Sequence, residues 1–296
     1  MQTFASCGLK RSCSAVIALL GMVAANLLAD DNVRKSNSVK DEPKNVAAEE
    51  KGDVAERRMA VMKSRAEGFH FSSSDKDFPK QLQPMPLFRY EDQTRGYVDG
   101  TVWRLGEQGR PLAIITAELH PMYLGAASVV VYDFLSLTER PFTAKSADVT
   151  GWTPRGSAVT MLKIPDAPEP SKATAARLGQ IKQLARRFKG TQEVTELNTS
   201  FVHLRMLPRE IDRYSPDKTA ESDGAIFLFV NGRNPAIVLL IETNGQEWQY
   251  GIGRLSAPSE LTMRLDDTIV WKQPRASGSL LWTNPYTASN APATFP

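Results

Sequence analysis

The chain has 296 residues, of which 42% are apolar and 23% charged, close to the averages for soluble globular domains. These values exclude a generally disordered chain, a collagen-like fibre and a polytopic membrane protein. The formal net charge of only +3 leaves no electrostatic footprint for nucleic acid, so we expect no nucleic-acid partner.

Residues 1–29 have the pattern of a secretory signal peptide. Lys10 and Arg11 supply the positive charge at its start, and a long apolar stretch follows. Small residues allow cleavage after Ala25 or after Ala29. The alternative is an uncleaved membrane anchor, because the apolar stretch approaches the ~18 residues that span a bilayer. We expect an exported protein, periplasmic or extracellular, with the signal removed.

Both cysteines, Cys7 and Cys13, fall inside this signal. The mature chain therefore has no cysteine, which excludes thiol catalysis, disulfides and thiolate metal sites. Residues 30–53 are charged and contain almost no large apolar side chain, and such a segment buries too little surface to order itself. We predict a flexible charged tail over these residues.

An internal repeat dominates the rest of the chain. Residues 84–118 align without gaps on residues 208–242, an offset of 124 positions, and the apolar positions agree as well. The identical pairs are Pro84/Pro208, Arg89/Arg213, Tyr90/Tyr214, Asp99/Asp223, Gly100/Gly224, Pro111/Pro235 and Glu118/Glu242. Shorter matches on either side continue the alignment at offsets near 119. We therefore predict two copies of one unit, residues 54–164 and 173–285.

A proline-rich linker, residues 165–172, separates the copies, and we expect residues 286–296 to be disordered. Each copy is predicted to open with an amphipathic helix, since Leu178, Ile181 and Leu184 recur at helical spacing. Several strands with polar turns follow, which predicts an antiparallel meander. The expected fold class is α+β, a tandem duplication of an αββββ unit with pseudo-twofold symmetry, whose sheets join edge to edge.

Several segments of the second copy resemble a family of uncharacterised exported bacterial proteins. They are RLGQIKQLARRF (177–188), RYSPDKTAESDGAIFLFVNGRNP (213–235), LLIE (239–242), WQY (248–250) and a closing VW (270–271). The resemblance covers nearly all of the mature chain. It implies export and a domain of the whole length, and it implies no activity, cofactor or site.

The repeated polar residues are the first candidates for a binding site. Arg89 and Tyr90, and equally Arg213 and Tyr214, precede an aspartate by the same spacing in both copies. Arg and Tyr are enriched in binding hot spots, because they bury area while offering hydrogen bonds. The alternative is structural: an Arg–Asp pair that fixes the loop to the hairpin.

Carboxylates provide the second candidate. Glu118 and Glu242 are equivalent in the repeat, and across a pseudo-twofold axis they would form an acid/base pair with one raised pKa. Glu118 and His120 lie two positions apart on one strand, so their side chains share a face. Each pairing predicts a hydrolase site between the copies; two exposed glutamates and a loop histidine are the alternative.

No other pattern supports catalysis. The three histidines have no metal-ligand spacing, and the chain has no nucleophile elbow and no phosphate-binding loop. Gly251 and Gly253 within a strand indicate a bulge or a close approach of another segment. We therefore expect no metal and no cofactor. We favour a non-catalytic exported protein that binds a macromolecular or cell-envelope partner over the hydrolase.

Overall fold

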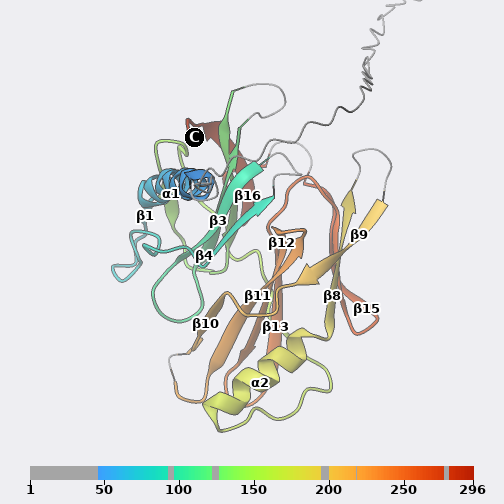
Figure 1. Ribbon diagram of the computed structural model, residues 1–296. Coiled ribbons are helices and arrows are strands. Elements are labelled where there is room, and N and C mark those ends of the chain that lie inside the picture. Colours follow the sequence, from blue (N-terminus) through green and yellow to red (C-terminus); the bar gives the residue numbers. More distant parts are fainter. Residues whose placement is uncertain (1–45, 93–96, 122–126, 195–199, 218, 277–279) are drawn as a thin grey trace, which may run out of the picture. The chain divides into compact units, whose positions relative to one another are not determined.

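The computed structural model describes residues 46–92, 97–121, 127–194, 200–217, 219–276 and 280–296. This part of the chain contains two helices and sixteen strands, so the protein is mostly antiparallel β-structure (Figure 1). The expected α+β class is therefore wrong. The predicted signal peptide and most of the predicted tail lie outside the described residues.

The elements follow one another in a similar order in the two halves of the chain, residues 46–164 and 173–296. Those of the first half are α1 (Val46–Glu67), β1 (His70–Ser72), β2 (Phe88–Asp92), β3 (Tyr97–Leu105), β4 (Ala113–His120), β5 (Val129–Ser136), β6 (Thr143–Lys145) and β7 (Leu162–Lys163). Those of the second half are α2 (Thr174–Ala185), β8 (Phe188–Val194), β9 (Ser200–Met206), β10 (Asp212–Tyr214), β11 (Asp223–Asn231), β12 (Asn234–Thr243), β13 (Trp248–Arg254), β14 (Leu261–Leu265), β15 (Thr268–Gln273) and β16 (Tyr286–Pro292).

The strands form two main sheets and one small one. The first main sheet has five strands in the order β16-β5-β4-β3-β2, and β1 pairs only with β6. The second is a curled sheet of nine strands in the order β15-β14-β8-β9-β11-β12-β13-β7, with β10 beside β11. The predicted αββββ meander fails because β8, which follows the helix, pairs with the distant β14 as well as with β9. That pairing curls the sheet.

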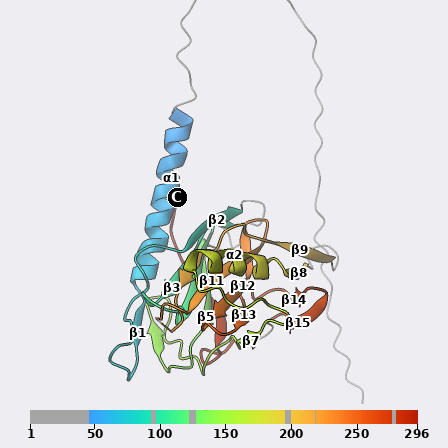
Figure 2. The same cartoon turned by 90° about the horizontal axis from the view of Figure 1, so that it is seen from below.

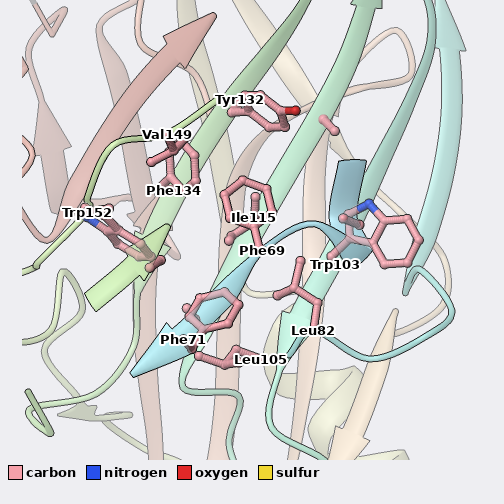
Figure 3. Close-up of a cluster of buried hydrophobic side chains, with 14 of the residues drawn as sticks. Phe69, Phe71, Leu82, Trp103, Leu105, Ile115, Tyr132, Phe134, Val149 and Trp152 are labelled. Atoms are coloured by element: carbon pink, nitrogen blue, oxygen red, sulfur yellow. The ribbon is translucent and has the colours of Figure 1, made fainter. Parts of the chain in front are cut away.

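Each helix covers the outer face of one main sheet. α1 packs along β3 and β4, whereas α2 lies across β11 and β12 (Figures 1 and 2). Met62 and Ala66 of α1 join an aromatic cluster with Phe69, Trp103 and Phe134, which Figure 3 shows in part. The aromatic residues Trp103 and Phe227, which correspond in the repeat, are both fully buried beneath their helices.

The inner faces of the two sheets pack against each other. Ile114 and Leu135 of the first sheet belong to one buried cluster with Ile226, Leu228 and Leu240 of the second. The expected edge-to-edge joining of the sheets is therefore wrong. The reason is that β3 and β11 are buried on both faces, so each sheet has a helix on one side and another sheet on the other.

The same strand pairings recur in both halves at the offsets of the sequence repeat. His70 pairs with Lys145 and Lys189 with Arg264, each 119 positions further on. Tyr90 pairs with Gly100 and Tyr214 with Gly224, at an offset of 124. The correspondence between the halves thus extends from residue type to strand register.

The last strand of each half covers an edge strand of the other half. β7, which ends the first half, pairs with β13, and β16, which ends the second half, pairs with β5 along its whole length. The prediction that residues 286–296 are disordered is therefore wrong for the strand. The predicted tail also ends earlier than expected, because α1 already begins at Val46.

Candidate functional site

Five repeated residues of the first half lie together on β2, β3 and β4, and we call them the Arg-Tyr clamp: Arg89, Tyr90, Asp99, Gly100 and Glu118. The Arg89 guanidinium binds both oxygens of Asp99, with Nε 2.9 Å from Oδ1. It also donates to the carbonyl of Ala55 in α1 at 2.6 Å. The clamp therefore ties β2, β3 and the helix together.

The tyrosine of the clamp lies over a glycine. A Cβ atom at Gly100 would come within 2.6 Å of the Tyr90 ring, so only glycine leaves room for the ring. The hydroxyl of Tyr90 then reaches across β3 and donates to Glu118 Oε1 at 2.8 Å. Both Tyr90 and Glu118 are buried.

The second half repeats the clamp. Arg213 binds Asp223 at 3.1 and 2.8 Å and donates to the carbonyl of Thr174 at 2.9 Å. Tyr214 lies over Gly224 and donates to Glu242 Oε1 at 2.6 Å. The six residues predicted as ligand-binding thus lie in two clamps, four of them buried and the two arginines about one third exposed.

The two clamps are connected through the hairpin turns of the opposite halves. Arg110, in the β3–β4 turn, binds Glu242 with Nε 2.7 Å from Oε1. Asn234, at the β11–β12 turn, donates its amide to Glu118 Oε1 at 3.3 Å. Each half therefore supplies a partner for the buried carboxylate of the other.

This arrangement keeps the two carboxylates apart. Asn234 begins β12 and Glu242 lies near its end, and about 25 Å of strand separates them at ~3.3 Å per residue. Because Glu118 is beside Asn234, the carboxylates remain more than about 10 Å apart after side-chain lengths are subtracted. The structure does not bring Glu118 and Glu242 together as an acid/base pair.

The predicted pairing of Glu118 with His120 is present. His120 Nε2 lies 3.2 Å from Glu118 Oε2, and its ring contacts Tyr97 with centroids 5.7 Å apart. The remaining histidines, His70 and His203, are exposed on separate strands. In the described ranges no three His, Cys, Asp or Glu side chains gather as a metal site.

Asp133, a buried acid on β5 that faces the second sheet, was not predicted from the sequence. Tyr286 of β16 donates its hydroxyl to this carboxylate, and Thr116 Oγ1 lies 3.3 Å from its Oδ2. Burial, together with the nearby negative charge of Glu118, raises the pKa of Asp133 to about 7. A signal was present, since Asp133 is the one charged residue in the apolar run VVVYDFLS.

No family model, curated protein or solved structure matches this chain. Of the helices in the described segments, neither has the length and apolar character to cross a membrane.

A groove of about 1270 Å³ opens beside the β3–β4 turn. Its walls are that turn, residues 77–84, residues 137–140 and Pro216-Asp217. Five carboxylates and three basic side chains line it: Glu67, Asp77, Glu107, Glu139 and Asp217, and Lys80, Arg110 and Arg140. Of the basic groups, Arg110 is held by Glu242 and Arg140 by Asp75. The groove thus presents an acidic surface.

Proposed function

We propose that this protein is an exported, non-catalytic binding protein, whose acidic groove holds a cationic segment of a macromolecular or cell-envelope partner. The observation that carries the proposal is the groove, with five carboxylates against three basic side chains. Its volume exceeds the ~300–1,000 Å³ of common small-molecule pockets, which favours an extended segment of a larger molecule.

Two of the five groove carboxylates are available to a partner. Asp77 and Glu107 form no side-chain hydrogen bond or ion pair within the described ranges, and both are exposed. Two of the three basic groups already have carboxylate partners, so they offer little to an anion. A lysine or arginine side chain is the ligand that this charge balance favours.

The clamps support a binding role over a hydrolytic one. Both oxygens of Glu118 and both of Glu242 accept hydrogen bonds or ion pairs inside the protein. Such carboxylates are fixed and buried, as suits groups that hold strands together. Export is supported by the signal pattern of residues 1–29.

Calorimetric titration with two short peptides tests the proposal. One alternates lysine with glycine, and the other alternates serine with glycine. We expect the lysine peptide alone to bind, and its affinity to fall at least tenfold in Asp77→Asn/Glu107→Gln. The control Glu56→Gln/Glu169→Gln removes the same charge at exposed positions outside the groove. Equal loss in both variants, or no binding of the lysine peptide, would contradict the proposal.

A hydrolase that uses Glu118 and His120 is the second candidate, and their 3.2 Å contact is the observation in its favour. There Glu118 would orient His120 as the general base. Incubation with simple ester, glycoside and peptide substrates tests it. Turnover that is lost in His120→Gln, with the far-UV circular dichroism spectrum unchanged, would support the hydrolase over the binding protein.

A further inference from the structure

The C-terminal strand makes one buried side-chain hydrogen bond to the first sheet. β16 pairs with the outer edge of β5, and Tyr286, its first residue, donates its hydroxyl to Asp133 Oδ1. Asp133 is 7% exposed and Tyr286 is 9% exposed. Tyr286 therefore covers the carboxylate from the side on which β16 lies.

No positive charge neutralises this carboxylate within the described part of the chain. Arg254 of β13 stacks over the Tyr286 ring, with its guanidinium carbon 5.1 Å from the ring centre. The Arg254 nitrogens donate instead to backbone carbonyls, those of Ser256, Ala257, Ser259 and Pro274. Arg254 thus holds a loop in place and only partly offsets the charge of Asp133.

The other groups that face Asp133 are polar or acidic. Thr116 of β4 contacts its carboxylate, and Glu118 of the same strand and Tyr90 of β2 lie nearby. An ionised Asp133 is therefore a buried charge beside a second carboxylate, which burial and like charge both disfavour. Two events remove the free-energy cost of this buried charge. Either Asp133 takes up a proton, or Tyr286 moves away and water reaches the carboxylate.

We propose that Asp133 and Tyr286 form a pH-sensitive latch for the C-terminal strand. With a proton on Asp133, β16 stays paired with β5. After the proton is lost, the segment from Tyr286 to Pro296 opens more readily and exposes the β5 edge.

The direction of the pH dependence follows from the pKa of Asp133. This pKa is about 7 in the closed state and near 4 when the carboxyl is hydrated. Because the closed state binds the proton more tightly, the stabilisation is complete below pH ~4 and is lost as the pH rises through 7. Between pH 6 and 8.5 these two values predict an increase of about tenfold in the opening equilibrium constant.

Hydrogen exchange of the full-length protein, followed by mass spectrometry, tests the latch. After correction for intrinsic exchange, we expect fragments that contain β16 to lose about tenfold protection between pH 6 and 8.5. Fragments of β13, whose edge is covered by β7, serve as the internal control and should keep their protection.

Two variants identify the group responsible. Asp133→Asn cannot lose a proton, so it should abolish the pH dependence in β16. Glu118→Gln removes the neighbouring charge and should move the midpoint of the transition below 7. If Asp133→Asn does not fold, the pH midpoint of β16 exchange in Glu118→Gln decides whether Asp133 is the titrating group. Equal protection of β16 at both pH values in the unmodified protein, or an unmoved midpoint in Glu118→Gln, would overturn the latch.

Discussion

Corresponding carboxylates in the two clamps have different electrostatic surroundings. Glu242 faces the guanidinium of Arg110, whereas Glu118 faces the neutral amide of Asn234 and the ring of His120. The two positions at the hairpin turns differ by a single substitution, Arg against Asn. It leaves the buried negative charge of the first half without a strong counter-charge, next to Asp133. The half that carries Asp133 is therefore also the half whose clamp carboxylate lacks a guanidinium partner.

The glycine beneath each clamp tyrosine can be tested directly. Gly100→Ala would place a methyl group 2.6 Å from the Tyr90 ring, and we expect a loss of about 1–3 kcal/mol in the free energy of unfolding. Gly179→Ala is the matched control, because nothing lies within 4 Å of its Cβ position in α2. It should stabilise the protein by about 0.5–1 kcal/mol. Urea unfolding measures both; a neutral Gly100→Ala would contradict the clamp.

The contact between Arg110 and Glu242 should contribute to the stability of the protein. Arg110→Met keeps the apolar part of the side chain but leaves a carboxylate that is 4% exposed without its cation. We expect a loss of about 2–3 kcal/mol in urea unfolding, somewhat less than for a fully buried pair, because Arg110 is one third exposed. The double variant Arg110→Met/Glu242→Gln should recover most of it. An equal loss in the single and double variants would contradict this account.

The repeated residues could be found from the sequence, but their role could not. Five of the seven identical pairs belong to the clamps, so the comparison of the two copies located them without the structure. Whether Arg and Tyr point to a partner or into the protein depends on the register of β2 against β3, which local sequence does not determine. Asp133 was overlooked because it has no acidic counterpart in the second half. Asp133 pairs with Thr116, and at the corresponding pair of the second half Gly251 lies opposite Leu240.

β16 has only seven residues, but it covers a whole edge of the first sheet. It occupies the edge of β5, which would otherwise present unpaired backbone groups to other molecules. Deletion of residues 286–296 should therefore lower the melting temperature and produce oligomers in light scattering. Deletion of Pro296 alone keeps the strand and the packing of Phe295 against the core, and is the control. A monomeric product of the longer deletion would show that the edge is protected in another way.

Strand positions were more predictable than strand partners. The apolar runs at residues 101–105 and 225–230 lie within the buried strands β3 and β11, and Gly251 and Gly253 indicated a close approach. The structure shows that approach: Cβ atoms there would meet Met161 at 2.6 Å and Leu135 at 2.7 Å. The α+β class was wrong because the pairing of β8 with β14 joins segments about 70 residues apart. β16, with the sequence YTASNAP, has no apolar alternation to reveal it.

At the scale of the molecule, the two halves are joined by reciprocal contacts. Each half contributes a turn residue to the clamp of the other, and each ends in a strand that covers an edge of the other. The buried ion pair between Arg104 and Asp212 adds a further link across the sheets. Neither half has a complete set of covered edges alone, so we expect neither to be stable alone.

Unfolding should therefore be a single cooperative transition. Trp248→Phe/Trp271→Phe leaves Trp103, Trp152 and Trp282, which all lie in or against the cluster beneath α1, as the fluorescent probes. Trp103→Phe/Trp152→Phe/Trp282→Phe leaves Trp248 and Trp271, in or against the cluster beneath α2. These variants enlarge no side chain, and we expect the denaturant midpoints within each variant to coincide for fluorescence and far-UV circular dichroism. Arg104→Met should lower both midpoints together, since it leaves Asp212 charged and buried between the halves. Separate midpoints for the two halves would show that they are independent domains, and that the reciprocal contacts add little to stability.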